Sequence, residues 1–176
     1  MKAQDIFLKQ PVFTLADLRH SLDREHSCNK RSREALVSYH LRHGHLIRIR
    51  RGLFAVVPPG ADPESYPVDP YLVAAKSADD AVLAYHTALE VHGKAHSVFE
   101  RYFFQSNKPL RPSTFRTYRF QCVLFPKALR EKGQQQFATK IVERAGLDIR
   151  VATLERTLVD VLDRPELGGG WEETWR

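Results

Sequence analysis

The chain has 176 residues, of which 43% are hydrophobic and 27% charged, and a net charge of +6, as expected for a globular protein of one medium or two small domains. No run of 18 apolar residues is present, so we expect no membrane span, and Met1 to Gln10 lacks the apolar core and cleavage site of a secretory signal. Cys28 and Cys122 lie far apart and form no Cys-x-x-Cys pair, so we expect two reduced thiols in a cytoplasmic protein.

The first elements predicted are a short helix, a short strand and a second helix. Ala3 to Lys9 predicts the helix, which Pro11 ends, and Val12-Phe13 predicts an edge strand. Thr14 stands three residues before Asp17, in the pattern of a capping box that opens the next helix. Its apolar residues recur at helical spacing: Leu15, Leu18 and Leu22.

A third helix begins at Asn29 or Lys30 and ends before Gly44, which is placed as a C-terminal glycine cap. At 100° per residue its apolar side carries Leu36, Val37, His40 and Leu41. The opposite side carries Arg31, Ala35, Ser38 and Arg42. Small residues allow a helix to approach DNA closely, and arginines reach base edges or phosphates.

The periodicity after Gly44 changes from that of a helix to that of a strand. Apolar and basic residues alternate over Leu46–Arg50, Arg51-Gly52 predicts a turn, and Leu53–Val57 predicts a second, apolar strand. The order of helix, short strand, two helices and a basic hairpin is that of a winged helix-turn-helix. Its third helix would enter the major groove and its hairpin would contact the backbone or the minor groove.

The net charge is concentrated in this first part of the chain. Residues 19–51 hold nine Lys or Arg and three Asp or Glu, which accounts for the whole excess of +6, and the remaining charges balance. A basic segment on a neutral body is typical of a phosphate-backbone binder. We therefore predict these DNA-binding residues: Lys30, Arg31, Arg33, Ser38, Arg42, Arg48, Arg50 and Arg51. A solvated basic face and a helix-hairpin module for protein contacts are the alternatives.

Prolines divide the chain into two halves. We predict a DNA-binding domain over 1–58, a Pro-rich linker over 59–68 and an α+β domain over 69–176. In the second half, Pro70 to Ser77 and Ala81 to Val91 are predicted to be helical. Strands are predicted over Arg101 to Gln105, Arg116 to Phe125 and Leu147 to Val151. The predicted fold class is α+β: an N-terminal winged helix-turn-helix followed by a mixed α/β C-terminal domain.

The sequence offers few candidates for catalysis or metal binding. His40, His43 and His45 have no cysteine or carboxylate to complete a metal site, so packing and phosphate contacts are favoured. His86 is a possible general base, but no Gly-x-Ser-x-Gly, phosphate-binding loop or paired catalytic carboxylates accompany it, so a packing role is favoured. We expect no catalytic residues, no metal and no cofactor.

The last predicted helix begins at the N-cap Thr153 and ends before Pro165. Its apolar stripe is expected to face the core and consists of Leu154, Leu158, Val161 and Leu162. The polar cluster of this helix is Glu155, Arg156 and Asp160, in which Arg156 and Asp160 are spaced to pair. We interpret the cluster as structural, with Arg156 buried as a clamp between helix and sheet; a partner-binding surface is the alternative.

Several strings of the sequence together resemble the AbiEi family of antitoxins of type IV toxin-antitoxin systems. In the first half they are Phe13–Asp17 and Gly44–Phe54. In the second half they are Tyr85–Leu89 with Gly93, Glu155–Asp160, and Gly168–Gly170. The hairpin pattern is shared with other winged-helix proteins, whereas the Glu-Arg-Thr-Leu-Val-Asp string followed by glycines is more particular to this family.

The resemblance implies a bacterial repressor that binds inverted repeats in its own promoter. It also implies that the second domain counters a nucleotidyltransferase-like toxin, without a stable complex. Family members continue with further helical sequence, whereas this chain ends at Trp171–Arg176, so we interpret it as a short or truncated member. The alternatives are the DNA-binding part of a nuclease-type enzyme and a winged-helix module for protein interaction. The absence of an acidic metal-site pattern argues against the nuclease.

Overall fold

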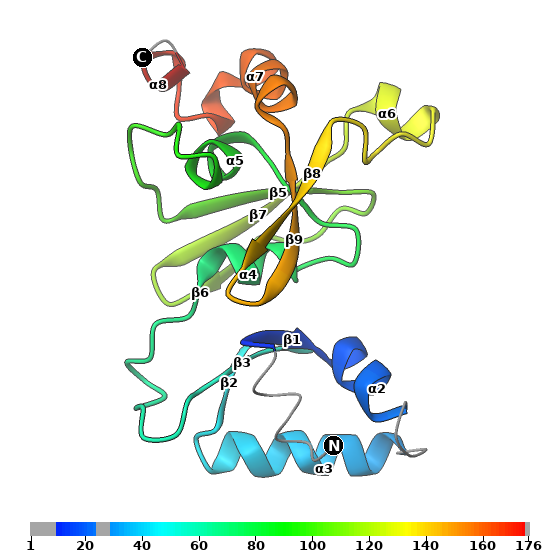
Figure 1. Ribbon diagram of the computed structural model, residues 1–176, viewed down its shortest axis with the longest axis vertical. Helices are drawn as coiled ribbons and strands as arrows, with labels where there is room; N and C mark the ends of the chain where they lie inside the picture. The colour runs from blue at the N-terminus through cyan, green and yellow to red at the C-terminus, as the bar shows by residue number, and fades with distance from the viewer. Residues whose placement is uncertain (1–9, 24–28, 175–176) are drawn as a thin grey trace. The chain divides into compact units, whose positions relative to one another are not determined.

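The computed structural model describes residues 10–23, 29–174 and the connections within them. The predicted helix over Ala3 to Lys9 and the thiol of Cys28 lie outside these residues. The chain divides into two compact units, one comprising residues 1–69 with 145–147 and the other residues 70–144 with 148–176. The fold is mixed α+β, as the sequence predicts (Figure 1). None of the described helices is long and apolar enough to cross a membrane.

The first unit contains a three-stranded antiparallel sheet and two described helices. The elements in chain order are β1 (Val12–Thr14), α2 (Leu15–Asp23), α3 (Lys30–Arg42), β2 (Leu46–Arg50) and β3 (Leu53–Val56). The strand order is β1-β3-β2, so β3 pairs with both neighbours. Thr14 caps α2 through its hydroxyl, which accepts from the backbone N–H of Asp17, and the Asp17 carboxylate accepts from the N–H of Thr14 in return. The predicted capping box is therefore present.

The core of the first unit lies between the sheet and both helices. Phe13 of β1 and Phe54 of β3 are paired across the strands and stack with ring centroids 5.6 Å apart. Leu18 of α2, Val37 of α3 and Leu46 of β2 complete the buried cluster. Each helix therefore turns its apolar residues towards the same pair of aromatic rings, which fixes the face that α3 presents to solvent.

The Pro-rich segment that follows β3 is held in place by turns. Asp62 accepts hydrogen bonds from Ser65 and from the backbone N–H of Glu64, and the Val57 N–H donates to the carbonyl of His45. A Cβ added to Gly44 would lie 2.9 Å from Cγ of Pro63, so the end of α3 and this segment are in direct contact. Only glycine fits at residue 44, where φ is also +70°.

The second unit is built on a six-stranded mixed sheet. Its helices are α4 (Pro70–Ala75), α5 (Tyr85–Val91), α6 (Lys127–Glu131), α7 (Leu154–Asp163) and α8 (Trp171–Thr174), with a 3-10 turn at Pro165–Leu167. Its strands are β4 (Val82–Leu83), β5 (Arg101–Ser106), β6 (Ser113–Phe115), β7 (Tyr118–Leu124), β8 (Thr139–Arg144) and β9 (Leu147–Ala152). The strand order is β6-β7-β5-β4-β9-β8, with β5 parallel to β7 and β4 parallel to β9.

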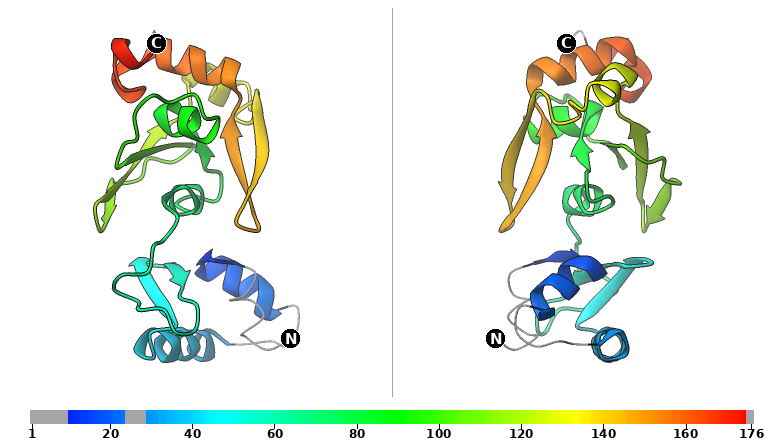
Figure 2. Two further views of the ribbon diagram at one scale, coloured as in Figure 1. Left: turned by 60° about the vertical axis from the view of Figure 1, so that its left-hand side comes forward. Right: turned by 90° about the vertical axis from the view of Figure 1, so that its right-hand side faces the viewer.

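Helices cover both faces of the centre of this sheet. Helices α5 and α7 lie on one face and α4 on the other (Figures 1 and 2). Because side chains alternate along a strand, Phe103 of β5 packs under α5 and α7, while the neighbouring Tyr102 meets Tyr71 of α4 edge to face at 5.2 Å. The helix predicted from Ala81 starts only at Tyr85, because Val82–Leu83 joins the sheet as β4 and satisfies its backbone groups there.

Candidate nucleic-acid interface

Helix α3 presents an exposed polar face because both of its ends and its apolar side are fixed. Its N-terminus is capped by Asn29, whose side-chain oxygen accepts from the Ser32 N–H at 2.8 Å. At its C-terminus the N–H of His45 donates to the carbonyl of His40 at 2.9 Å across Gly44. The predicted outward face is exposed in the structure and comprises Arg31, Ala35, Ser38 and Arg42.

The β2–β3 hairpin carries the other predicted cations. Arg48 is exposed on β2, and its guanidinium lies 5.9 Å from the ring centroid of Phe54. Arg50 is half-buried at the end of β2, where the strand register shifts between Arg48 and Arg50. Arg51 is exposed at the turn, beside Gly52 with φ +81°. The turn is tied to α2 by a hydrogen bond from the Leu15 N–H to the Gly52 carbonyl.

The exposed cations of this unit are available to an external anion. Arg31, Arg42 and Arg51 form no ion pair with any residue that the structure describes. Lys30 pairs with Glu34 at 4.0 Å, but both side chains are mostly exposed, and such a pair contributes about 0.3–0.5 kcal/mol. Arg33 is half-buried and, at 100° per residue, lies on the side of α3 that carries His40 and Val37, opposite Arg31. All eight predicted DNA-binding residues thus lie on α3 or on the hairpin of one unit.

An aromatic and histidine cluster at the C-terminal end of α3 includes a residue that the sequence pattern did not single out. Tyr39 is 52% exposed and packs against His43 with ring centroids 4.1 Å apart, at helical spacing i, i+4. His40, predicted to face inward, is half-buried, with its Nδ1 3.1 Å from Nδ1 of His45. Burial, with smaller contributions from His45 and His43, lowers the pKa of His40. The pattern Tyr-His-x-x-His before the glycine was the available signal.

These histidines do not assemble a metal site. Among the described residues, no group of three or more His, Cys, Asp or Glu side chains is arranged to hold a metal ion. His86 in the second unit is fully buried, stacked on Phe99 at 4.0 Å, with its Nδ1 3.4 Å from a carboxylate oxygen of Glu90. A ring enclosed in this way packs the core and is not accessible to a substrate.

Two members of the polar cluster predicted on the last helix are buried, and the third is exposed. Arg156 is 6% exposed, and Asp160 is also buried, with its carboxylate 3.7 Å from Nε of Arg156. Glu155, by contrast, is exposed at the start of α7, where hydrogen bonds from its own backbone N–H and from the Thr153 side chain lower the pKa of its carboxyl. The predicted burial of Arg156 is confirmed, and Glu155 does not join the pair.

Arg156 connects three segments of the second unit. One guanidinium nitrogen donates to the carbonyls of Gln135 and Phe137, at 2.9 and 2.6 Å, and the other donates to the side-chain oxygen of Gln105 at 2.6 Å. Gln105 is fully buried on β5, and its amide donates to Asp160 at 3.2 Å. Burial raises the pKa of Asp160, against the opposing effect of Arg156 and Gln105. No sequence signal identified Gln105 as the third member.

The predicted apolar stripe of α7 is wrong in orientation. Leu154, Leu158 and Leu162 are 39%, 53% and 40% exposed, and only Val161 of the predicted four is buried. The buried face of α7 is instead Arg156, Thr157, Asp160 and Val161. The physical reason is the clamp, because Gln105 and two backbone carbonyls accept from the terminal nitrogens of Arg156, and Asp160 accepts from Gln105, so that a polar face can turn inward.

Comparisons with known proteins define the fold and no more. No family model and no curated protein matches the chain. A solved structure, the RV2827C protein from Mycobacterium tuberculosis, matches with a TM-score of 0.53 and 18% sequence identity. The match covers 98% of this chain and 62% of the mycobacterial chain, so this chain spans less than two thirds of its length. At that identity the likeness is one of α+β fold.

Proposed function

We propose that the first unit is a winged helix-turn-helix that binds duplex DNA, with α3 in the major groove and the β2–β3 hairpin against the backbone. The observation that carries the proposal is the exposed face of α3, on which Arg31 and Arg42 have no ion pair with any described residue and lie beside the small residues Ala35 and Ser38. An α-helix about 10–12 Å in diameter fits a major groove about 12 Å wide, and the thirteen residues of α3 give it a length of about 20 Å.

The topology and the charge support the same proposal. The sheet order β1-β3-β2 supports the proposal, because the β2–β3 hairpin follows α3 in the chain as a wing follows a recognition helix. The cations of the hairpin, Arg48, Arg50 and Arg51, follow α3 in the chain and belong to the same unit. Phosphate contacts from such residues position the protein, while contacts from α3 to base edges select the sequence.

The experiment is a titration of labelled promoter DNA, followed by fluorescence anisotropy at several salt concentrations. We expect log K to fall steeply with log salt, with a slope set by about four to seven phosphate contacts at roughly −0.9 per contact. Arg42→Ala is expected to weaken promoter binding more than binding to random DNA, whereas Arg50→Ala weakens both equally. Lys127→Ala, an exposed cation of the second unit, is the matched control and leaves both unchanged.

Two outcomes would contradict this assignment. A salt slope near zero would exclude phosphate contacts as the source of affinity, and with it the DNA-binding proposal. A reversed pattern, in which Arg50→Ala relaxes specificity and Arg42→Ala weakens all sequences equally, would make the hairpin the reader of sequence.

We further infer, from the resemblance to AbiEi antitoxins, that the chain is a cytoplasmic repressor of its own operon that counters a nucleotidyltransferase-like toxin. The strings that carry this resemblance include Glu155–Asp160 and Gly168–Gly170 of the second unit. The first test is whether a nucleotidyltransferase-like reading frame lies immediately downstream of its gene, and the second is co-expression with the product of that reading frame. We expect the full chain to restore growth. Restoration of growth by the first unit alone, or no restoration by the full chain, would contradict the inference.

A further inference from the structure

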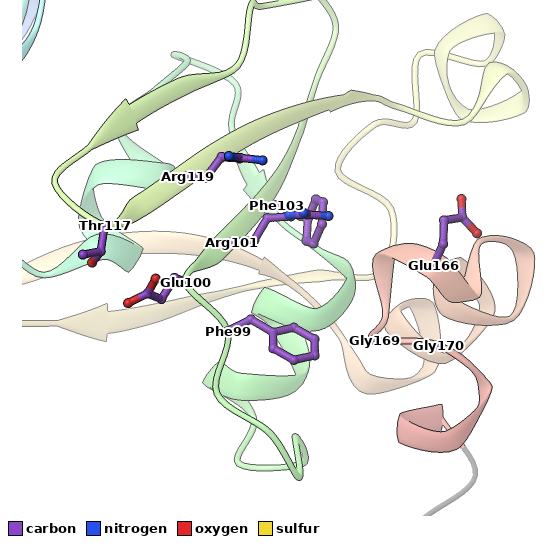
Figure 3. Close-up of a pocket in the computed structure, with 9 residues that line it drawn as sticks. All are labelled: Phe99, Glu100, Arg101, Phe103, Thr117, Arg119, Glu166, Gly169 and Gly170. Atoms are coloured by element: carbon purple, nitrogen blue, oxygen red, sulfur yellow. The ribbon is translucent and has the colours of Figure 1, made fainter.

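The second unit contains a pocket of about 640 Å³ that the DNA-binding proposal does not use. Its walls come from the start of β5, the start of β7 and the chain after α7 (Figure 3). The residues that bear on its chemistry are Phe99, Arg101, Arg119, Glu166, Gly169 and Gly170. A pocket of this size lies within the range of about 300–1,000 Å³ that small-molecule sites occupy.

Two arginines lie side by side at this pocket. Arg101 of β5 and Arg119 of β7 are partners in the parallel register, so their side chains leave the same face of adjacent strands, about 4.8 Å apart at the backbone. Both are exposed, and neither forms an ion pair with a residue in the part of the chain that the structure describes. Because the two positive charges repel each other, an anion that accepts hydrogen bonds from both is stabilised there.

Two glycines and an aromatic ring also line the pocket. Gly169 and Gly170 have φ of +101° and +93°, and neither places a side chain into the pocket. The ring of Phe99 is held by His86, which stacks on it with centroids 4.0 Å apart. A rigid aromatic side chain at the wall of a pocket suits a planar ring in the ligand.

Two carboxylates also line the pocket, and they constrain the ligand. Glu100 points away from both guanidinium groups in Figure 3, whereas Glu166 stands across the pocket from them. Glu166 accepts hydrogen bonds and repels a second negative group. The ligand therefore combines one anionic end, a planar ring and hydrogen-bond donors.

We propose that this pocket binds a nucleoside monophosphate, with the phosphate on Arg101 and Arg119 and the base against Phe99. An arginine binds phosphate through parallel, charge-assisted hydrogen bonds, which gives orientation as well as affinity. Glu166 accepts from the ribose hydroxyls or the amine of the base. The site is independent of the DNA-binding face on α3, since all its residues belong to the second unit.

The experiment is isothermal titration calorimetry on the full chain with AMP, adenosine and inorganic phosphate at constant ionic strength. We expect AMP to bind most tightly. The double variant Arg101→Gln/Arg119→Gln is expected to weaken AMP binding about ten- to a hundredfold. Phe99→Leu is expected to weaken AMP binding without changing the affinity for inorganic phosphate. Arg111→Gln, an exposed arginine of the same unit outside the pocket, is the matched control and leaves AMP binding unchanged.

Melting temperatures separate binding from folding, since Arg101 and Arg119 are exposed and their substitution is expected to leave the melting temperature unchanged. Three outcomes overturn the proposal: no AMP binding at millimolar concentration, equal affinity for AMP and inorganic phosphate, or the same loss in Arg111→Gln as in the double variant. Binding of a short single-stranded oligonucleotide through Arg101 and Arg119, without AMP binding, would replace the mononucleotide with a nucleic acid.

Discussion

Helices α3 and α7 are both amphipathic, but they bury opposite kinds of face. In α3 the apolar residue Val37 is buried, and Arg31 and Arg42 face solvent, as the helical periodicity predicts. In α7 an arginine and an aspartate are buried and three leucines face solvent. The difference shows that periodicity identifies the two faces of a helix. Which face turns inward depends on the hydrogen-bonding and packing partners that neighbouring segments offer.

The two helices also differ in the environment of their arginines. On α3, Arg31 and Arg42 are hydrated and free to bind an external anion, so their removal is expected to change binding and not folding. On α7, Arg156 is removed from water, its two terminal nitrogens donate to Gln105 and to two backbone carbonyls, and its Nε lies 3.7 Å from the Asp160 carboxylate. Its contribution depends on the complete set of partners, because a buried charge with one partner missing is strongly unfavourable.

The largest expected effect follows from removing the buried arginine. Arg156→Ala removes the cation beside the buried Asp160 carboxylate and the donor to the Gln105 oxygen, and it is expected to lower the free energy of unfolding by about 3–5 kcal/mol. Urea unfolding of the full chain measures this. Glu155→Ala, one residue away but exposed, is the control and is expected to stay within about 0.5 kcal/mol. An Arg156→Ala variant with unchanged unfolding and lost toxin rescue would instead make Arg156 a functional surface.

A smaller effect is expected where α7 meets the glycine string. A Cβ at Gly168 would lie 2.4 Å from Cγ1 of Val161, whose side chain belongs to the core. Gly168→Ala is therefore expected to lower the free energy of unfolding by about 1–3 kcal/mol. The double variant Gly168→Ala/Val161→Ala removes the clash and tests its origin. If the double variant costs as much as the sum of the two single changes, steric overlap is not the cause.

The exposed stripe of α7 predicts a near-neutral substitution where the sequence alone predicts a damaging one. Leu158 is 53% exposed, so Leu158→Gln is expected to change the free energy of unfolding by less than about 0.5 kcal/mol. Val161→Ala is the buried counterpart on the same helix and is expected to cost more, about 1–3 kcal/mol, from lost burial and a cavity. A larger loss for Leu158→Gln would restore the orientation predicted from the sequence.

The smallest expected effect is a pH dependence at the end of α3. The pKa of His40 is lowered in the folded chain, first by burial and then by His45 and His43, so the unfolded chain takes up a proton first as the pH falls. The stability of the first unit is therefore expected to decrease as the pH falls below about 6.5. Hydrogen exchange of the α3 amides between pH 7.5 and 5.5 measures it. His40→Gln is expected to flatten the response, whereas His20→Gln, exposed on α2, is expected to retain it.

The sequence predicts the first unit better than the second, for a physical reason. The Thr14–Asp17 box, the limits of α3 and the alternating hairpin are all local signals, and the structure contains each of them. The inward face of α7 depends on Gln105, which is 51 residues from Arg156, and on carbonyls that no side-chain pattern reveals. Val82–Leu83 became a strand because a tertiary partner, β5, is present. Contacts over such sequence distances leave no periodicity to detect.

The contact between Gly44 and Pro63 determines which residues must be transferred together when a chimaera is built from this chain. The predicted linker, residues 59–68, has the composition of a flexible tether, yet Pro63 packs on the glycine that ends α3, and Val68 is buried. A junction placed at residue 58 would remove the support of that helix end, whereas one at residue 69 keeps α3, its cap and the proline together. A chimaera designed to transfer the proposed DNA-binding specificity should therefore include residues 1–69 together.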